Sequence, residues 1–433
     1  MTSNMDILKI LIPLHTMPDT KSFITLFFEN LLPVIQNRTK VQIMWLVYTP
    51  EKLPVIQQNN SENIILDIHN YKNALDVIQK EKPDIIYASE TWQFIDYALS
   101  STAKVFHIPV FCVVYSNIWI AKSATKNMIS NLSRFFQDSI PTDTEQQKKK
   151  FMRRGRFYIY KYLFMLRTMM VLKKDRLQSL FTIWKFVLSD RLDPRFASET
   201  IQFLENESLI KQRLDLGFNK SNLIVTGNPI YDAAFHKMSN QKDTDKKDGI
   251  IRVLFAPSTL YEHGFWTSKQ REYAVQETVK QIVQNGKEMS LTVKIHPSSS
   301  VLSDYKSLIH SIDSSIPVYQ KGDIQDFLKD VDVVVSFQSS TAEVYALLSK
   351  RPIIICNFFN IQGDVFLEQG LAIDCKEPSS IVSSIHTALL SDLPLEQKRE
   401  NFIREFMYRW DGRAGERICN KIIELVEKRK VNQ

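Results

Sequence analysis

The chain alternates short apolar runs rich in β-branched residues with longer segments whose apolar residues recur every three to four positions. This alternation occupies residues 7–116 and returns over residues 250–375. Within residues 332–356, a strand pattern, a polar turn, a helix pattern and a second strand pattern follow one another directly. Such βαβ units build parallel sheets with right-handed crossovers. The sequence therefore predicts an α/β fold with two doubly wound, Rossmann-like domains that face a cleft.

The length of 433 residues exceeds what one ordinary core accommodates, which also favours two domains. We predict an N-terminal domain over residues 1–225 that carries a helical basic insertion at about 119–215. A second domain is predicted over residues 226–394, and the helices of residues 395–433 are expected to pack back toward the first domain. The polar run 236–249 has no apolar anchor and is predicted to be a linker or long loop.

Composition excludes several classes of protein. The chain is 44% hydrophobic and 24% charged, as is typical of soluble globular proteins. Its four cysteines are scattered without a CxxC pair, which argues against a disulfide framework or a zinc site. Glycine-rich dinucleotide and P-loop motifs are missing, so we expect no cofactor. With no signal-peptide pattern and no run of about 18 apolar residues, a cytoplasmic protein is expected.

Polar residues interrupt the apolar pattern between the strand at 332–335 and the following helix. Ser339, Ser340 and Thr341 stand where a parallel strand ends and a helix begins. The carboxyl edge of a sheet and the N–H groups of a helix N-terminus both favour an anion at this place. Ser340 and Glu343 also fit a capping box, which is a purely structural role. The two interpretations are compatible, since a cap in the empty protein can become part of a phosphate site.

Other polar residues follow predicted strands of both domains. His296 and Pro297 follow the strand at 291–295, and Ser258 with Thr259 follows the first strand of the second domain. Because parallel strands end at one edge, these residues are expected near the serines. For His296 the alternative is a backbone turn, and for Ser258 and Thr259 ordinary loop polarity. In the first domain, His15 and Glu90 follow two strands in the same way, although a lone loop His or Glu is commonly an ordinary surface residue.

Most of the positive charge lies in one segment. Residues 148–176 contain eleven Lys or Arg and one Asp, a local charge of +10, whereas the rest of the chain carries −3. Phe, Tyr, Met and Leu alternate with these bases, a mixture that suits an anionic membrane surface. The alternative is a solvated helical hairpin. No recognition motif accompanies the charge, so no nucleic acid partner is expected. The residues predicted to contact the membrane are Arg153, Arg154, Lys173 and Lys174.

Four motifs carry a resemblance to a known superfamily: "KIHPSSS", "SFQSSTAEVYALLSKRPIII", "VTGNPIYDA" and "WDGRAGERI". In their order and spacing, over roughly residues 205–420, they resemble the nucleotide-binding domain of GT-B glycosyltransferases. Three families are similar: bacterial sialyltransferases and polysialyltransferases, CDP-glycerol glycerophosphotransferases, and UDP-N-acetylglucosamine 2-epimerases. The first half of the chain matches them only in its pattern of elements.

The resemblance implies a GT-B fold in which the second domain binds a nucleotide-activated donor and the first domain holds the acceptor. The donor is expected to be of the CMP/CDP or UDP type. His15 or Glu90 is expected to be the base that takes a proton from the acceptor hydroxyl. Because no Asp-x-Asp motif is placed for a metal, we expect metal-independent transfer. The expected donor-binding residues are His296, Pro297, Ser339, Ser340, Thr341, Ser258, Thr259 and Glu343.

The leading functional hypothesis is a transferase that moves a sugar, or a polyol phosphate, to a cell-surface polysaccharide or a lipid-linked acceptor at the inner face of the cell membrane. An enzyme like the UDP-N-acetylglucosamine 2-epimerases is an alternative. The arginine-bearing loop of those enzymes is replaced here by "IPLHTMPDTKSF". A non-catalytic membrane- or carbohydrate-binding GT-B protein is the third possibility.

Overall fold

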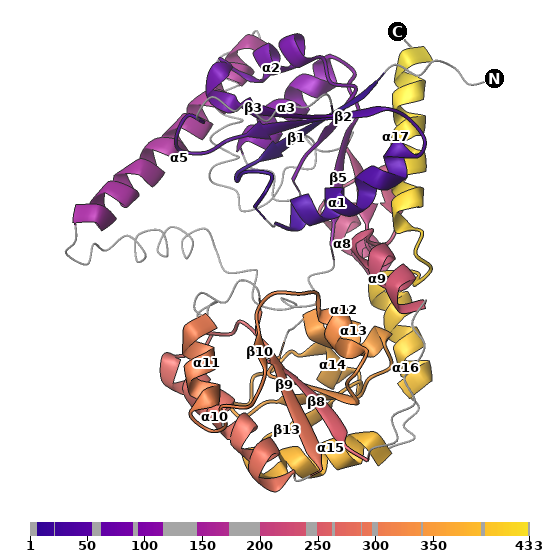
Figure 1. Ribbon diagram of the computed structural model, residues 1–433. Coiled ribbons are helices and arrows are strands. Elements are labelled where there is room, and N and C mark those ends of the chain that lie inside the picture. Colours follow the sequence, from indigo (N-terminus) through magenta and orange to yellow (C-terminus); the bar gives the residue numbers. More distant parts are fainter. Residues whose placement is uncertain are drawn as a thin grey trace. The chain divides into compact units, whose positions relative to one another are not determined.

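A computed structural model shows two compact α/β units (Figure 1). The first unit holds the described residues up to Ala233 and those from Glu405 onward, and the second holds the described residues between them. The structure describes residues 7–20, 22–53, 62–89, 94–115, 145–172, 200–239, 249–261, 265–286, 288–296, 302–338, 341–390 and 395–431.

The first unit is built on a seven-stranded sheet in the order β3-β2-β1-β4-β5-β6-β7. Every neighbouring pair is parallel, as the βαβ alternation predicts. Residues of alternating parity along β1 enter different cores, so both faces of the sheet are buried. The strands are β1 (Leu8–Leu14), β2 (Val41–Val47), β3 (Asn63–Asp67), β4 (Ile85–Tyr87), β5 (Val110–Val114), β6 (Ile201–Leu204) and β7 (Leu223–Val225).

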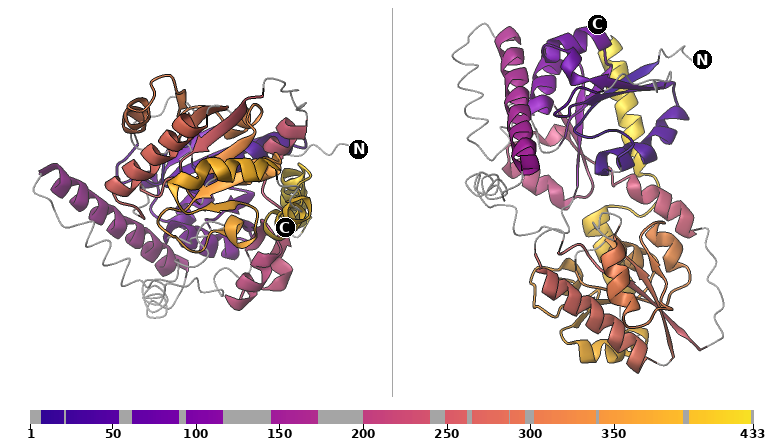
Figure 2. Two further views of the ribbon diagram at one scale, coloured as in Figure 1. Left: turned by 90° about the horizontal axis from the view of Figure 1, so that it is seen from below. Right: turned by 60° about the vertical axis from the view of Figure 1, so that its left-hand side comes forward.

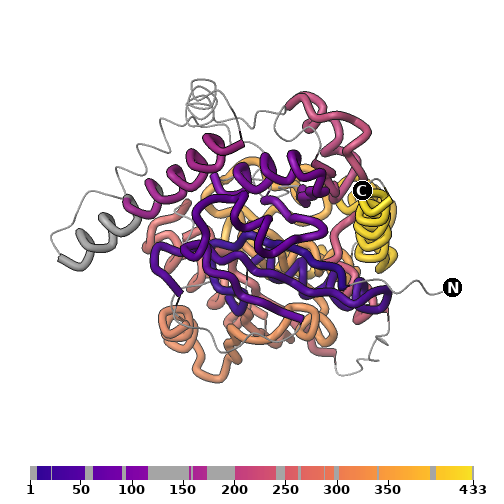
Figure 3. Tube along the Cα trace, turned by 90° about the horizontal axis from the view of Figure 1, so that it is seen from above, coloured from indigo at the N-terminus to yellow at the C-terminus, as the bar shows by residue number. Residues whose placement is uncertain are grey.

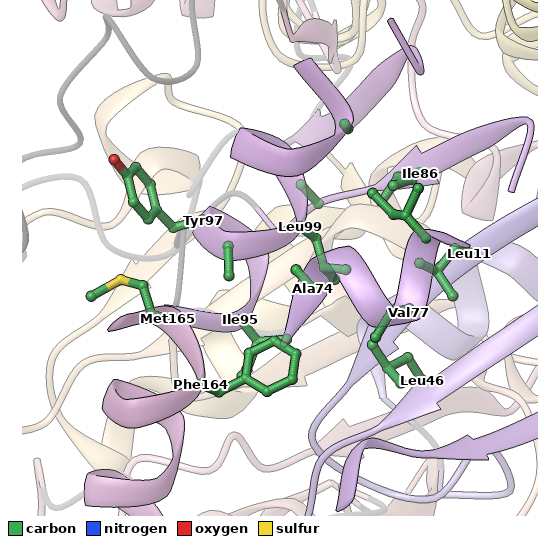
Figure 4. Packing of buried hydrophobic residues seen from close by; sticks show 14 of the residues in the cluster. Leu11, Leu46, Ala74, Val77, Ile86, Ile95, Tyr97, Leu99, Phe164 and Met165 are labelled. Carbon is green, nitrogen blue, oxygen red and sulfur yellow. The ribbon is translucent and has the colours of Figure 1, made fainter. Parts of the chain in front are cut away.

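Helices cover both faces of this sheet (Figures 1 and 2). On one face α1 and α17 pack together over a core that includes Phe28, Trp45 and Ile418. On the other face α2, α3 and α5 enclose Leu11 and Phe164 (Figure 4). The helices of this unit are α1 (Phe23–Gln36), α2 (Ala74–Glu81), α3 (Phe94–Val105), α5 (Glu145–Leu172), α8 (Ser208–Asp215), α9 (Ile230–Ser239, which continues into the second unit) and α17 (Ala414–Val431), with 3-10 turns at Ile68–Asn70 and Lys220–Asn222.

The second unit has a six-stranded parallel sheet in the order β10-β9-β8-β11-β12-β13. Its strands are β8 (Ile251–Ala256), β9 (Met289–Lys294), β10 (Val318–Tyr319), β11 (Val333–Ser336), β12 (Ile353–Cys356) and β13 (Ile373–Cys375). Its helices are α10 (Ser268–Asn285), α11 (Leu302–His310), α12 (Ile324–Leu328), α13 (Thr341–Leu348), α14 (Val365–Glu368), α15 (Ile381–Leu390) and α16 (Leu395–Phe402), with a 3-10 turn at Pro378–Ser380 and a π-helix at Ile403–Met407.

Two predictions from the sequence differ from the structure. Strand β6 lies inside the segment predicted to be helical, because the run "IQFL" is too short to show a period of two. Helix α9 extends to Ser239, so the first four residues of the predicted linker 236–249 are helical. Lys237 on this helix forms an ion pair with Asp326 at 2.8 Å, a contact that local composition does not predict. Among the residues that the structure describes, no helix has both the length and the apolarity needed to cross a membrane.

Both sheets reverse their strand order at one position, between β1 and β4 in the first unit and between β8 and β11 in the second. At such a reversal the two neighbouring crossovers lie on opposite faces, which opens a crevice at the carboxyl ends of the strands. Ligands of open α/β sheets bind there. The residues after β1 and β4, and those after β8 and β11, are therefore the first to consider as functional.

Candidate functional site

Ser258 and Thr259 lie just beyond the carboxyl end of β8, at the strand-order reversal of the second unit. Both residues are buried. The Ser258 hydroxyl has no hydrogen-bond partner within the described ranges. A buried hydroxyl without a partner costs free energy and is rare in proteins. Its position at a ligand-binding edge makes a ligand oxygen a suitable partner.

Lys294, the last residue of β9, was not predicted from the sequence. It is buried, and its Nζ donates hydrogen bonds to the carbonyl oxygens of Ile295 at 3.1 Å and Gln320 at 2.8 Å. Burial lowers the pKa of Lys294, and the charge of Asp323 opposes this shift. His296 follows two residues later and is partly buried. The sequence feature that could have indicated Lys294 is its position directly before Ile-His-Pro. The name Ser258 cluster is used below for five residues that share only their place at the carboxyl ends of β8, β9 and β11: Ser258, Thr259, Lys294, His296 and Thr341.

The helix after β11 begins with Thr341, which is exposed at the carboxyl edge of the sheet. Glu343 is fully buried in the first turn of this helix, and its carboxylate accepts a hydrogen bond from the Ser336 hydroxyl. This contact gives Glu343 a structural role, while donor binding by Glu343 stays a prediction. Pro297, Ser339 and Ser340 lie outside the described residues, as does the predicted capping box between Ser340 and Glu343.

Aromatic rings that the sequence did not single out lie beside the same edge. The Trp266 ring centroid is 4.9 Å from that of Phe337, which follows β11, and 5.2 Å from that of Phe359. The carbonyl oxygen of Leu260 accepts hydrogen bonds from the backbone N–H groups of Phe265 and Trp266. The buried indole N–H of Trp266 has no acceptor among the described residues. Trp266 and Phe337 belong to the core of the second unit, and Phe359 packs against this core and is partly exposed.

In the first unit, four titratable side chains gather at the carboxyl edge and are called the His15 cluster. His15 follows β1, and its ring centroid is 6.3 Å from that of Tyr48, which follows β2. Asp96 lies in the first turn of α3, where it is fully buried and accepts a hydrogen bond from the Ser89 backbone N–H at 2.7 Å. Lys161 comes from α5 and is partly buried. Glu90, the residue after Ser89, lies outside the described residues.

The members of the His15 cluster act on one another electrostatically. Partial burial, and next the positive charge of Lys161, lower the pKa of His15. Burial lowers the pKa of Lys161, while the negative charge of Asp96 opposes this shift. Burial and then Asp96 raise the pKa of Tyr48. The result favours a neutral imidazole at neutral pH, which is the form that accepts a proton.

Helix α5 carries residues 148–172 of the basic segment as one continuous helix (Figures 2 and 3). Its outer side exposes the large apolar side chains of Ile159, Leu163, Met170 and Val171. Arg156 and Arg167 are exposed as well. Arg153 and Arg154 lie within the helix, but their side chains are outside the described set, as are Lys173 and Lys174 entirely.

Two of the four sequence motifs meet in the first unit. Arg417 of "WDGRAGERI" donates from Nε to the carbonyl oxygen of Thr226 at 2.7 Å and forms an ion pair with Asp411 at 2.9 Å. Gly227 of "VTGNPIYDA" has a φ of +79°, and a Cβ there would lie 3.3 Å from the Ala414 Cβ. These motif residues therefore join β7 to the start of α17 and serve the structure. In the described ranges, no three His, Cys, Asp or Glu side chains gather as metal ligands do.

Residues 215–424 match the model of a family described as CDP-Glycerol:Poly(glycerophosphate) glycerophosphotransferase. The matched segment contains the Ser258 cluster and the two joined motifs. The segment also includes all four motifs on which the sequence resemblance rests. No curated protein sequence matches the chain.

Solved structures resemble the whole chain at low sequence identity. A putative UDP-N-acetylglucosamine 2-epimerase from Listeria monocytogenes is 14% identical, with a TM-score of 0.55 over 98% of each chain. The UDP-GlcNAc 2-epimerase from Neisseria meningitidis, bound to UDP-GlcNAc, is 14% identical, with a TM-score of 0.52 over 96% of this chain and 100% of the other. A variant of the wall teichoic acid polymerase TagF is 9% identical, with a TM-score of 0.52 over 98% of this chain and 89% of the other.

Such identities establish the fold alone, and the fold agrees with the prediction from the sequence. Two parallel α/β domains of this type constitute the GT-B fold. The likeness to sialyltransferases stays a prediction. The chain thus has the GT-B fold, and its residues 215–424 match the model of the CDP-glycerol:poly(glycerophosphate) glycerophosphotransferase family.

Proposed function

We propose that the protein is a transferase that moves a polyol phosphate or a sugar from a nucleotide-activated donor to a hydroxyl group of a cell-surface polysaccharide or a lipid-linked acceptor. The observation that carries the proposal is the family match, because it spans the Ser258 cluster at the strand-order reversal. The description of the family favours a cytidine diphosphate polyol as donor. A UDP-sugar is the other donor class.

In this proposal the Ser258 cluster binds the donor's phosphates. The Ser258 hydroxyl and the N–H groups at the start of α13 donate hydrogen bonds, and Lys294 supplies positive charge. His296, Pro297, Ser339, Ser340 and Thr259 complete the binding set as predictions from the sequence. The partly exposed Phe359 ring, which packs against Trp266, offers apolar surface to the base or the sugar. Charge that develops on the leaving phosphate is stabilised without a divalent metal.

His15 is the proposed base, with Glu90 as the alternative. Its lowered pKa keeps it neutral near pH 7, so it can take the proton of the acceptor hydroxyl as the oxygen attacks. The oxygen bonds to the phosphorus of the polyol phosphate, or to the anomeric carbon of a sugar. The bond to the leaving nucleotide phosphate breaks at the same time.

We also propose that α5 contacts the cytoplasmic face of an anionic membrane, which would bring the enzyme to a lipid-linked acceptor. The exposed apolar residues of α5 lie beside exposed arginines, the combination that suits an interface between lipid headgroups and acyl chains. Arg153, Arg154, Lys173 and Lys174 would add charge to this surface.

Thermal-shift measurements with CMP, CDP, UDP and GDP test the donor site, since a ligand that binds the native state stabilises it by about 2.7 kcal/mol at 100 times its Kd. Stabilisation by CMP and CDP, reduced in His296→Ala, supports a cytidine donor. Release of CMP from CDP-glycerol that depends on an added polyol or polysaccharide acceptor supports transfer. Epimerisation of UDP-GlcNAc without any acceptor would instead identify the epimerase-like alternative.

A further inference from the structure

A cavity of about 440 Å³ lies at the amino edge of the first sheet, opposite the edge that carries the His15 cluster. Pro83 and Asp84 line it just before β4 begins, and Ile108 lines it just before β5, the neighbouring strand. Its remaining walls are the last turn of α2, Phe106 after α3, and the last two turns of α17. The proposed base lies at the other edge of the sheet, so the cavity is separate from the site proposed for transfer.

One part of the cavity lining is apolar. Ile78, Ile108 and Val426 line it and are buried, and the partly buried Phe106 ring adds to this part of the lining. Ile78 and Ile108 belong to the core on one face of the sheet, whereas Val426 belongs to the core on the other face. A cavity of this volume lies in the range of small-molecule sites, and its apolar lining favours contact with an alkyl or aryl group.

The other part of the lining is positively charged. Lys82, Arg429 and Lys430 line the cavity, and among the described residues Asp84 is the one acidic side chain that does so. Three positive charges and one negative charge give the lining a net charge of +2. The Asp84 carboxylate already accepts a hydrogen bond from the Lys9 backbone N–H at 2.8 Å. The charge of the lining therefore favours an anion.

Arg429 is fixed at the wall of the cavity by the segment before β4. Its Nη1 donates hydrogen bonds to the carbonyl oxygens of Pro83 at 3.1 Å and Asp84 at 3.2 Å. The buried Nε–H has no acceptor among the described residues, and a donor in that state costs free energy. A guanidinium held in this way has lost rotamer freedom before a ligand arrives, and its planar fork matches the oxygens of a phosphate or carboxylate.

The carboxyl ends of two helices give a second reason for these charges. Lys82 is the C-cap of α2, with a φ of +50°, and Arg429 and Lys430 lie in the last turn of α17. Positive charge at a helix carboxyl end interacts favourably with the helix dipole. This role accounts for the sign of the charge, but it requires no apolar cavity beside it. A ligand with both an anionic and an apolar part accounts for the two together.

We propose that this cavity binds an amphiphilic anion, a phosphate or carboxylate group attached to a short alkyl or aryl part. The anionic oxygens accept hydrogen bonds from Arg429 and interact with the charges of Lys82 and Lys430. The alkyl or aryl part covers the apolar part of the lining. This binding goes beyond the proposed function and does not depend on it. Both a soluble metabolite and a lipid with an anionic headgroup carry this chemistry.

Isothermal titration calorimetry of the full-length protein tests the ligand class with octyl phosphate, inorganic phosphate, 1-octanol and dihexanoyl phosphatidic acid. Octyl phosphate is expected to bind at one site and at least about 10-fold more tightly than inorganic phosphate, which lacks the apolar part. It should also bind at least about 10-fold more tightly than 1-octanol, which lacks the anion. Tighter binding of dihexanoyl phosphatidic acid than of octyl phosphate identifies a lipid source, and the reverse order identifies a soluble one.

Two substitutions in the charged part of the lining test the place of binding. Arg429→Gln should weaken octyl phosphate binding by about 10- to 150-fold, as expected for hydrogen bonds lost to a charged group. Lys82→Gln removes an exposed charge and should weaken it by about 2- to 5-fold. The control is Lys428→Gln, which removes a positive charge from the last turn of α17 at a position that does not line the cavity. If Arg429→Gln fails to fold, Lys82→Glu, which reverses the exposed charge, takes its place.

Saturating CDP should leave the affinity for octyl phosphate unchanged, and so should Arg156→Gln combined with Arg167→Gln on α5. Displacement by CDP would place the anion in the donor site, and weaker binding in the α5 variant would place it on α5, so either result overturns the inference. Wild-type affinity in the folded Arg429 and Lys82 variants overturns it as well. The same holds if octyl phosphate fails to bind, or binds no more tightly than 1-octanol or inorganic phosphate. Failure of CDP to bind would contradict the proposed function alone.

Discussion

Asp232 and Gly415, 183 positions apart, are joined by a hydrogen bond of 2.7 Å from the Gly415 backbone N–H to Asp232 Oδ2. The other carboxylate oxygen accepts from the Ala414 N–H at 3.1 Å. A carboxylate at this point satisfies two N–H groups in the first turn of α17 and interacts favourably with the helix dipole. The start of the last helix is therefore fixed by a residue in the first turn of α9.

Replacing Asp232 with Ala should lower the free energy of unfolding by about 1–3 kcal/mol, because two backbone N–H groups lose a charged acceptor. Denaturant unfolding of the full chain measures the change. Arg413→Gln, which breaks an exposed ion pair with Glu416 on the same helix, is the control and should cost less than about 1 kcal/mol. Equal effects of the two substitutions would contradict the role assigned to Asp232.

Ser258→Ala should weaken nucleotide binding without lowering the stability of the protein. The Ser258 hydroxyl has no partner within the described residues, so its loss should leave the unfolding free energy almost unchanged. Affinity for the nucleotide should fall by about 10- to 150-fold, as expected for one lost hydrogen bond to a charged group. Calorimetry with CDP measures the change, and Ser383→Ala, exposed on α15, is the control. Wild-type affinity in the Ser258 variant would remove this residue from the donor site.

Glu343→Ala should destabilise the second unit by about 2–4 kcal/mol, because the buried Ser336 hydroxyl loses its acceptor and a cavity forms. Glu343→Gln retains a carbonyl acceptor and should lose less stability. Nucleotide affinity of the folded Gln variant should equal that of the wild type if Glu343 is structural. A large loss of affinity with intact stability would instead support the predicted contact with the donor.

The surface of α5 should bind anionic vesicles through both charge and apolar contact. We expect Arg156→Gln with Arg167→Gln to weaken co-sedimentation mainly at low salt, because added salt already screens these charges. Ile159→Ser with Leu163→Ser should weaken binding at both low and high salt, because apolar insertion is not screened.

The control for this comparison is Lys211→Gln with Lys220→Gln, which changes the charge equally at exposed positions of the same unit. It should bind vesicles like the wild type. If co-sedimentation of the wild-type protein does not change with the phosphatidylserine content of the vesicles at either salt concentration, α5 has no membrane role.

Turnover should persist in excess chelator, because the proposed stabilisation of the leaving phosphate comes from Lys294, His296, hydroxyl groups and the N-terminus of α13. Product formation is compared with and without EDTA after removal of trace metals. Complete loss that added Mg²⁺ restores would contradict the proposal. A modest change in rate is compatible with a metal that assists product release.

The sequence predicted the parallel sheets and the polar strand ends because both depend on local patterns. A β-branched run followed by a polar turn and a helix period defines a βαβ unit with little need for long-range information. Strand β6 was not predicted, because four residues are too few to show a period of two. Its place in the sheet depends on pairing with β5 and β7. The position of Ser258 was predicted, but only the folded chain shows that its hydroxyl is buried and has no hydrogen-bond partner among the described residues.

The two lysines were harder to predict, because their roles depend on packing between distant segments. Lys294 resembles any lysine at a strand end until Gln320, 26 residues away, supplies a carbonyl acceptor. Lys161 was one base among eleven in a segment interpreted as a membrane surface. Its signal was its spacing from Phe164, Met165 and Thr168, which places it on the buried face of α5. The full burial of Asp96 in the first turn of α3 likewise depends on packing and is not visible in the local sequence.

Helix α17 completes a core that begins with β1, since Ile418, Ile422 and Val426 pack with Ile10, Phe28 and Trp45. The ribosome makes β1 before the second unit and α17 after it. One face of the first sheet therefore stays without this cover until α17 has been translated, whereas the second unit, which ends at Arg404, can close earlier. During synthesis the nascent chain carries a finished later unit before its earlier one, and its exposed apolar sheet face is the natural target for a chaperone.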